Sequence, residues 1–336
     1  MKVVVFTDLH FGIYRDLSLI DKQIDTLKRI LLEEDPDILV VCGDVFHLRN
    51  SYTETILKTL DFFKGACATY IVRGNHDTVN KVGSTRSLIE VLESGDHVRV
   101  INEVETLPVG GRWFSFVPHY EDPKELDLAV YKAKSGSPDF FFGHFGYHGA
   151  LQHPGCSDEA NVKLSELLDQ EDLIASFLGH IHKPNDCGNV HIIGTQYSCS
   201  FGEANQTKRY AVIEDDKYTF KPIDFGIRHI LGDYEFVKEE VKKYKNTHSI
   251  LARVVLESAA KIFERDIKED ILNDGALICD IRIMASNYAP NSVSLSAPVF
   301  HINESVIDEY VETNAPTFNL DKVKLKKIFR DISNED

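Results

Sequence analysis

The sequence lacks any apolar run long enough to span a membrane. The first apolar run, residues 3–6, ends before Asp8, and no stretch approaches the roughly 20 apolar residues that a spanning helix needs. The same run is too short for the apolar part of a secretory signal peptide. We therefore expect a soluble, cytoplasmic protein that has no membrane partner.

The sequence also lacks the cysteine spacing of a zinc site or a disulfide framework. No cysteine belongs to a CxxC pair, and the cysteines are scattered along the chain. Such thiols suit burial in a reducing compartment, and we predict that none of them binds zinc. The six positions are Cys42, Cys67, Cys156, Cys187, Cys199 and Cys279.

Basic residues are in deficit, since the formal net charge is −16. Proteins that bind nucleic acid gain affinity from Lys and Arg side chains that neutralise phosphates, so this charge argues against DNA as a substrate. The objection is weak, because divalent cations would offset several carboxylates and a partner subunit could supply a basic groove.

The chain has enough residues for one large core and a second small unit, with 336 residues of which 43% are hydrophobic. Its first two thirds alternate between strand and helix patterns. Short apolar runs predict buried strands at 2–6, 38–42, 69–72, 139–142, 177–178 and 190–193. Apolar stripes predict helices that begin near Leu17, Thr53 and Ser87. Glycine and aspartate turns predict hairpins at 98–117 and 209–223.

The pattern changes after Arg228, where the histidine-rich motifs stop. A βαβ-like unit follows, with strands at 250–256 and 276–284 and a helix capped by Ser258. We therefore predict three parts, residues 1–228, 229–313 and 314–336. The last part carries a basic amphipathic pattern at 320–332, which predicts a helix.

Five short motifs rich in Asp, Asn and His follow five of the predicted strands. They are Asp8-Leu9-His10-Phe11-Gly12, Gly43-Asp44-Val45-Phe46-His47, Gly74-Asn75-His76-Asp77, Gly143-His144 and Gly179-His180-Ile181-His182. In open α/β proteins, loops at the carboxyl ends of neighbouring strands converge on one crevice. We therefore expect the five motifs to form a single site.

The residue types in these motifs suit metal ions. Asp8 and His10 are two apart, so in extended backbone they point to the same side, and His180 and His182 repeat that spacing. We predict that each pair can bind one ion. Carboxylate, imidazole and amide donors without thiolates favour Mn²⁺, Fe or Zn²⁺ over Ca²⁺. Two ions about 3.5–4 Å apart would polarise a phosphoryl oxygen and activate water, as two-metal hydrolases require.

Each motif alone has a simpler interpretation. A Gly-His pair is often a surface or core histidine, and Gly-Asn-His-Asp can be an ordinary turn, because Gly, Asn and Asp favour turns. Five motifs in order, each at the end of a strand, favour the shared metal site.

The ordered set DxH, GDxx, GNHD, GH and GHxH resembles that of the calcineurin-like metallophosphoesterases, over about residues 1–228. The resemblance implies an α/β fold: a β-sandwich core flanked by helices in αββα layers, with a small α+β capping domain at 229–313. It implies two divalent ions, Mn²⁺ with Mg²⁺ as the alternative, bridged by Asp44. The other ligands that it implies are Asp8, His10 and His182 for one ion and Asn75, His144 and His180 for the other.

The same resemblance implies roles for three further side chains. His76 would contact the scissile phosphate and assist the leaving group, with Asp77 orienting its ring. His47 matches a second active-site histidine in part of the family and would position the DNA backbone. The alternative for His47 is a local hydrogen bond at the start of a helix.

The residues within and around the motifs indicate a branch of the family. GDVFH departs from the GDxVDRG of phosphoprotein phosphatases and, with GHIHKP and SFGEA, resembles the SbcD-type nucleases of double-strand-break repair. This implies a DNA exonuclease and endonuclease, the catalytic subunit of an SbcCD-type recombination and repair complex. The short chain suggests a compact, viral version that acts in the host cytoplasm.

The implied partners are DNA, an SbcC-like ABC-type ATPase with a coiled coil, and a second copy of the chain in a homodimer. The tail at 314–336 would bind the ATPase. Packing of this tail on the capping domain is the alternative.

Two other functions stay open. A small-substrate phosphoesterase that acts on nucleotides or phosphomonoesters fits the acidic charge better. A non-enzymatic adaptor would keep the fold only to hold an ATPase, but the intact set of candidate ligands opposes this.

Overall fold

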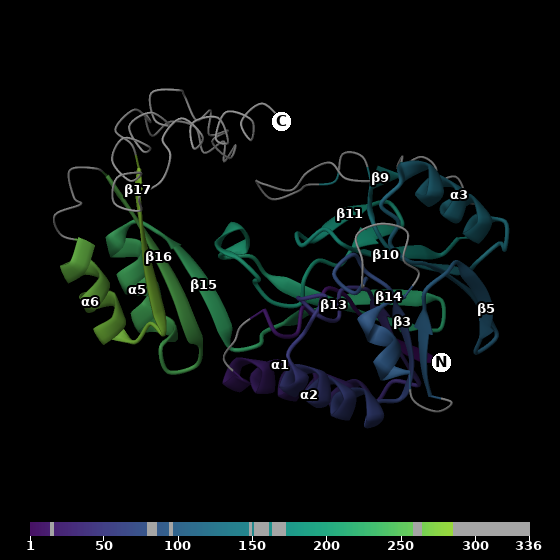
Figure 1. Ribbon diagram of the computed structural model, residues 1–336, viewed down its shortest axis with the longest axis horizontal. Coiled ribbons are helices and arrows are strands. Elements are labelled where there is room, and N and C mark those ends of the chain that lie inside the picture. The colour runs from purple at the N-terminus through teal and green to yellow at the C-terminus, as the bar shows by residue number, and fades with distance from the viewer. Residues whose placement is uncertain are drawn as a thin grey trace, which may run out of the picture. The chain divides into compact units, whose positions relative to one another are not determined.

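Two six-stranded sheets form the larger part of the chain (Figure 1). The computed structural model describes residues 1–13, 17–78, 86–93, 97–147, 150, 161–162, 173–257 and 264–284. The first sheet has the order β14-β13-β1-β2-β3-β4. Its parallel strands are β1 (Lys2–Phe6), β2 (Ile38–Cys42), β3 (Ala68–Val72) and β4 (Val98–Ile101). The hairpin of β13 (Lys208–Glu214) and β14 (Lys217–Ile223) extends one edge, with β13 antiparallel to β1.

The second sheet has the order β11-β12-β10-β7-β6-β5. Its parallel strands are β6 (Arg112–Val117), β7 (Phe140–His144), β10 (Ala175–Gly179) and β12 (Val190–Ile192). Antiparallel strands lie at both edges, β5 (Glu105–Val109) and β11 (Asn185–Cys187). A short separate pair is formed by β8 (Gly146–Tyr147) and β9 (Asn161–Val162).

The two sheets enclose one hydrophobic core between them, and each sheet has a further core on its outer face. Side chains along a strand point to opposite faces in turn, so Val3 and Val5 of β1 pack between the sheets while Val4 and Phe6 pack under helices. The core between the sheets is rich in phenylalanine: Phe114, Phe116, Phe140, Phe142 and Phe177. The predicted α/β sandwich with αββα layers is confirmed.

Helices cover the outer faces of the sandwich. The first sheet is covered by α1 (Leu17–Glu34), α2 (Thr53–Lys64) and the 3₁₀ helix η1 (Leu88–Leu92), and the second by α3 (Pro123–Lys134). The apolar stripe of α1 is buried as predicted. Side chains also define where helices begin: Ser87 and Glu90 form a capping box for η1, and Asp122 accepts a hydrogen bond from Lys124 N at the start of α3.

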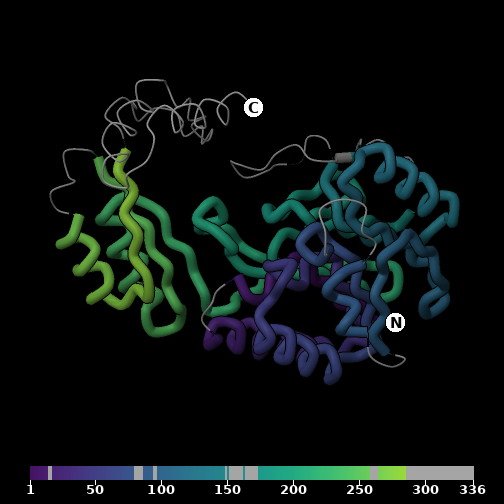
Figure 2. Tube along the Cα trace, viewed as in Figure 1, coloured from purple at the N-terminus to yellow at the C-terminus, as the bar shows by residue number. Residues whose placement is uncertain are grey.

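A third sheet has its own core. Its parallel strands are β15 (Ile227–Gly232), β16 (Ser249–Glu257) and β17 (Ile278–Met284), connected by α5 (Tyr234–Tyr244) and α6 (Glu264–Asp274) (Figure 2). Ile250, Ala252 and Val254 of β16 share a core with residues of both helices. The strands predicted at 250–256 and 276–284 are confirmed to within two residues. The boundary at 228 and the capping role of 229–313 stay predictions, and residues 285–336, with the predicted tail helix, lie outside the described residues.

The hairpin predicted over 98–117, with Gly110-Gly111 in its middle, is confirmed over 105–117 and wrong for 98–101. Strand β4 joins the first sheet, and only β5 and β6 pair with each other, around Gly110 and Gly111. Both glycines have positive φ, +56° and +85°, as a two-residue hairpin turn of type I′ requires. The prediction failed for residues 98–101 because the alternation of side chains defines a strand but does not say which sheet the strand joins.

Among the described residues, no helix combines the length and apolarity needed to cross a bilayer. Five of the cysteines fall in the part of the chain that the structure describes, and all five are free thiols. Cys156 lies outside that part.

Glu34, at the end of α1, is a buried carboxylate whose loss is expected to destabilise the sandwich. It accepts hydrogen bonds from Lys221 Nζ at 2.6 Å and Tyr210 Oη at 2.7 Å, and lies 2.9 Å from Lys2 Nζ. Burial opposes its ionisation, but these donors outweigh burial and lower the Glu34 pKa to about 2. The Glu34→Gln variant should lose unfolding free energy at neutral pH, because its neutral side chain no longer pairs with the lysines. The loss should be only about 1–2 kcal/mol, since solvent screens the half-exposed Lys221.

This contribution has a defined pH dependence. A carboxylate with a depressed pKa stabilises the fold fully above its ordinary value near 4.5, and the stabilisation is lost as the pH falls toward 2. Urea unfolding at pH 7 and pH 3 measures both effects, and the difference between wild type and Glu34→Gln should shrink at pH 3. Glu33→Gln, at the exposed neighbouring residue, is the control and should change little. Equal stability of Glu34→Gln and wild type at pH 7 would contradict the prediction.

Candidate metal centre

The five predicted motifs meet at the carboxyl ends of strands from both sheets. Asp8, Asp44 and Asn75 follow β1, β2 and β3, while His144 ends β7 and His180 follows β10. Strand β2 contacts both β7 and β10, so loops of the two sheets face each other. The structure brings all seven predicted ligands into one cluster, in which Asp8, His10, Asp44 and His144 are buried and the other three are half-buried.

One half of the cluster surrounds the Nε2 atom of His10. This atom lies 3.1 Å from Nε2 of His182, 3.7 Å from Oδ2 of Asp44 and 3.9 Å from Oδ1 of Asp8. The side chains of Asp8, His10 and Asp44 are at most 2% exposed. Two imidazole nitrogens and two carboxylates that converge in this way form a donor set suited to a divalent transition metal.

The other half surrounds the amide oxygen of Asn75. Its Oδ1 lies 3.0 Å from Nε2 of His144 and 3.1 Å from Nδ1 of His180. Asp44 takes part here too, because its Oδ1 lies 3.4 Å from Nε2 of His144. The two oxygens of Asp44 therefore face different halves, which is the geometry that a bridging carboxylate needs.

The carboxylates and imidazoles of the cluster shift one another's pKa. Burial opposes ionisation of Asp44, but His144 and His10 outweigh burial and hold the Asp44 pKa well below its usual range. Burial also opposes protonation of His144, and Asp44 outweighs it and raises the His144 pKa to about 9. Burial raises the pKa of Asp8, and nearby Asp44 adds to this. Buried carboxylates at such a site need a counter-charge, which a divalent cation can supply.

The prediction that extended backbone points both ligands of each pair to the same side is wrong. Asp8 and His10 do not lie in extended backbone, since their φ angles are +50° and +42°, and His180 has φ +83°. His180 and His182 also turn to opposite halves of the cluster, one toward Asn75 and the other toward His10. Left-handed turns at the strand ends, and not the alternation of a strand, bring the side chains together.

The predicted contact between Asp77 and the ring of His76 is also wrong. The carboxylate of Asp77 accepts hydrogen bonds from four backbone N–H groups, those of Gly74, Asp44, Val45 and Phe46, at 2.8–3.3 Å. The ring of His76 is held instead through Nδ1, 2.6 Å from the main-chain carbonyl of His47. Burial raises the Asp77 pKa to about 7, with Asp44 adding to the shift and the N–H groups opposing it. Asp77 therefore fixes the loops that carry Asp44 and Asn75.

His47 lies beside the cluster and does not begin a helix. Its ring stacks on that of His76, with centroids 5.3 Å apart, and lies 5.3 Å from that of His10. Helix α2 begins only at Thr53. Among the described residues, Nδ1 of His47 has no hydrogen-bond partner. The alternative of a local hydrogen bond at a helix start therefore has no support in the described geometry.

Two glycines allow the close approach of the loops. A Cβ atom at Gly74 would overlap Oδ1 of Asp44, and one at Gly43 would overlap the ring of His144. Gly43 also has φ +84°, which side chains disfavour. Any larger residue at these positions would displace a predicted ligand.

Three residues that hold the candidate ligands were not predicted. The Thr7 hydroxyl lies within hydrogen-bond distance of Asp8 Oδ2 and Cys42 O, and the Tyr197 hydroxyl lies 2.6 and 2.7 Å from the carbonyls of Leu9 and His10. Glu203, which is fully buried, accepts from Nδ1 of His182 at 2.8 Å. Glu203 belongs to the SFGEA segment, which indicated only a family branch, and no spacing rule linked it to His182.

One cysteine also lies at the cluster. Sγ of Cys199 lies within 4.8 Å of ring nitrogens of His10 and His182. Burial raises the pKa of this thiol well above its ordinary value, and Glu203 adds to the shift.

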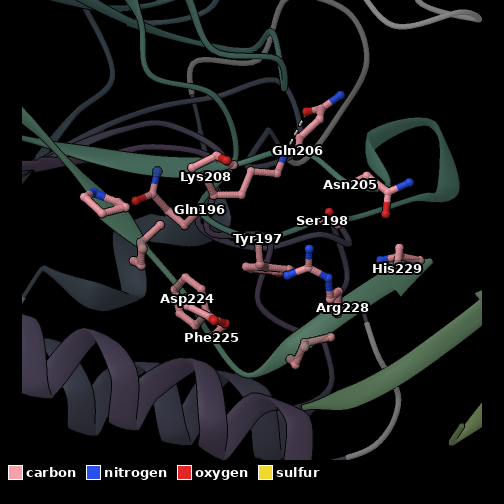
Figure 3. Close-up of a pocket in the computed structure, with 14 residues that line it drawn as sticks. Gln196, Tyr197, Ser198, Asn205, Gln206, Lys208, Asp224, Phe225, Arg228 and His229 are labelled. Carbon is pink, nitrogen blue, oxygen red and sulfur yellow. Dashed lines mark hydrogen bonds between the residues drawn. The ribbon is translucent and has the colours of Figure 1, made fainter. Parts of the chain in front are cut away.

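A separate polar pocket of about 330 Å³ lies beside β13 and β15 (Figure 3). Lys208, Arg228 and His229 line it, with the Nζ atom of Lys208 3.3 Å from Oε1 of Gln206. None of the predicted site residues lines this pocket. Lys208 connects it to the candidate metal centre, because the same Nζ donates to Glu203.

The model of the calcineurin-like phosphoesterase family matches residues 1–184, which is more than half of the chain. The chain therefore belongs to the calcineurin-like phosphoesterase family. The matched region contains all seven candidate ligands and His76.

Two curated proteins are similar to parts of the chain. Exonuclease subunit 1 of Enterobacteria phage T4 is 22% identical over 229 residues, which cover 64% of this chain and 65% of that protein. Putative phosphoesterase 244L of Invertebrate iridescent virus 6 is 27% identical over 124 residues, which cover 35% of this chain and 43% of that protein. The chain thus spans less than two thirds of the length of either relative.

Among solved structures, TT1561 of Thermus thermophilus matches with a TM-score of 0.40 and 12% identity, covering 66% of this chain and 99% of that one. A score this low does not by itself define a common fold.

Proposed function

We propose that this chain is a two-metal phosphodiesterase that cleaves DNA as an exonuclease and endonuclease. The observation that carries the proposal is the position of Asp44, whose two oxygens lie 3.4 Å from Nε2 of His144 and 3.7 Å from Nε2 of His10. Membership of the phosphoesterase family supports phosphoester hydrolysis as the chemistry.

The seven side chains would hold two divalent ions, Mn²⁺ with Mg²⁺ as the alternative. Asp8, His10 and His182 would hold one ion, Asn75, His144 and His180 the other, and Asp44 would contact both. Ions at such sites polarise a phosphoryl group and lower the pKa of water. The protein holds the loops that carry Asp44 and Asn75 in place, because five backbone N–H groups bind the carboxylates of Asp44 and Asp77.

His76 would act on the leaving group. Its ring lies at the edge of the cluster, with its centroid 4.9 Å from that of His10, and Nδ1 is bound to the carbonyl of His47. Nδ1 then carries the proton of the neutral ring, and Nε2 is available to exchange a proton with substrate. His47, stacked on this ring, would position the DNA backbone.

DNA is favoured over a small substrate by the similarity to a phage exonuclease subunit and by the SFGEA segment. The formal charge of −16 favours the alternative, a phosphoesterase that acts on nucleotides or phosphomonoesters. We further propose that the chain works in an SbcCD-type complex, with an SbcC-like ATPase that supplies the basic groove and a second copy of the chain as partner.

The test is hydrolysis of linear duplex DNA by the full chain in the presence of Mn²⁺, alone and co-expressed with a candidate SbcC-like ATPase. We expect Mn²⁺-dependent release of nucleotides that EDTA abolishes, and ATP-dependent cleavage of blocked ends in the complex. Hydrolysis confined to mononucleotides or phosphomonoesters would overturn the nuclease and support the alternative. No hydrolysis and no bound metal would overturn the enzyme altogether.

A further inference from the structure

A buried group of polar side chains binds His182 on the side away from the other candidate ligands. Glu203, from the 3₁₀ helix η2 (Phe201–Glu203), is fully buried and accepts from His182 Nδ1 at 2.8 Å. Its other oxygen, Oε2, accepts from Thr195 Oγ1 and Lys208 Nζ, both at 2.7 Å. Thr195 and Lys208 are themselves buried. Both oxygens of the carboxylate are therefore hydrogen-bonded to neighbouring side chains.

The same group holds the main chain of His182. Its carbonyl accepts from Thr195 N at 3.2 Å and from Lys208 Nζ at 3.3 Å. Both the ring and the backbone of His182 are thus fixed by residues that follow it by 13 to 26 positions. This geometry fixes the direction of the ring as well as its place.

The hydrogen bond to Glu203 also selects one tautomer of the His182 imidazole. Glu203 is paired with Lys208, so it is an acceptor only, and the bond to His182 must be donated by Nδ1–H. The lone pair of the neutral ring is then on Nε2, the atom that faces Nε2 of His10 at 3.1 Å. A metal ion needs this lone pair, and a carboxylate bound to the opposite nitrogen raises the basicity of the ligand.

We propose that Glu203 is a positioning residue, which holds His182 as the Nδ1–H form with Nε2 turned to the metal centre, and that Thr195 and Lys208 hold Glu203 in place. The inference rests on the proposed function, since it requires His182 to bind an ion. His144 differs in this respect, because its Nδ1 is bound by the main-chain carbonyl of Cys42, at 2.7 Å, which no substitution removes. His182 is therefore the ligand whose orientation a side-chain change can test.

The experiment compares Glu203→Gln with wild type in full-length, metal-free protein titrated with Mn²⁺ by calorimetry. Wild type should bind two ions. In the variant, one site should weaken about 10–100-fold while the other stays within about twofold, because only one ion is assigned to His182. Long-range ¹H–¹⁵N correlation spectra of ¹⁵N-histidine protein give a second readout. The Nδ1–H form of His182 should dominate in wild type and be depleted in Glu203→Gln.

A matched control separates metal binding from stability. Glu34→Gln removes another buried carboxylate that binds two lysines, Lys2 and Lys221, at a distance from the histidine cluster. It should lower the melting temperature and leave both Mn²⁺ affinities unchanged. If Glu203→Gln fails to fold because Lys208 loses its partner, the double variant Glu203→Gln/Lys208→Met removes both charges and takes its place, with the same expected loss at one site.

The outcomes distinguish this inference from the proposed function. One outcome is that wild type binds two Mn²⁺ ions and that Glu203→Gln keeps both affinities and the Nδ1–H form of His182. This outcome would overturn the role of Glu203 alone. A wild-type chain that binds no Mn²⁺ would overturn the metal centre, and the role of Glu203 with it. Loss at one site in Glu203→Gln, but not in Glu34→Gln, supports the inference.

Discussion

The Asp44→Asn variant is expected to bind at most one Mn²⁺ ion per chain and to hydrolyse phosphodiesters at least about a thousandfold more slowly than wild type. Asp44 is the carboxylate whose oxygens face both halves of the cluster, at 3.4 and 3.7 Å from the ring nitrogens of His144 and His10. An amide offers one neutral oxygen in place of two that share a negative charge. Loss of one ion removes stabilisation of several kcal/mol from the transition state, which corresponds to the expected loss of rate.

The amide keeps the shape of the side chain, and its oxygen can still accept the bond from His76 N, at 2.8 Å in wild type, so folding should survive. Metal content by elemental analysis and rates on linear DNA measure the effect. Asp37→Asn is the control, because Asp37 precedes β2 at the end opposite Asp44 and its carboxylate accepts a hydrogen bond from Lys2 N. It should keep two ions and the full rate. Normal metal content and rate in Asp44→Asn would refute the bridging role.

The central strands of the sandwich could be predicted because they are short apolar runs between polar or glycine residues, whereas the polar edge strand β11 was not predicted. The runs at 2–6 and 38–42 match β1 and β2, since both strands are buried on both faces and no alternation obscures them. Helix α3 and strand β15 were not predicted. The exposed Leu128 and Tyr131 blur the apolar stripe of α3, and β15 begins at the point where the pattern changes.

The residues of the candidate site could be predicted, but the contacts between them could not. Motif order and strand ends predicted that Asp44, Asn75 and His144 would meet, because parallel strands place their carboxyl ends together. The backbone conformation at Asp8 and the partners of Asp77 depend on contacts between loops that follow different strands, which local sequence does not specify. Glu203 lies 21 positions after His182, and local sequence carries no information on that pairing.

Replacement of His76 by Asn is expected to lower kcat on DNA by about a hundredfold to ten-thousandfold while two Mn²⁺ ions stay bound, the usual range for loss of a positioned acid. His76 is not one of the seven candidate ligands, and its bond to Asp44 comes from the main-chain N–H, which the variant keeps. The KM for DNA should change little. Rates and metal content of the same preparations measure both parts.

The choice of substrate shows whether His76 protonates the leaving group or only binds phosphate. An aryl phosphodiester releases a weakly basic phenolate that needs no proton, so His76→Asn should lose less than about tenfold on it, against a hundredfold or more on DNA. His97→Asn is the control, since His97 lies in the turn before β4. Equal losses on both substrates would assign His76 to phosphate binding, and loss of metal would make it part of the centre. Nδ1 of His76 is bound to the carbonyl of His47, at 2.6 Å, so the proton that reaches the leaving oxygen must come from Nε2. The difference in rate loss between the two substrates therefore measures proton transfer from Nε2.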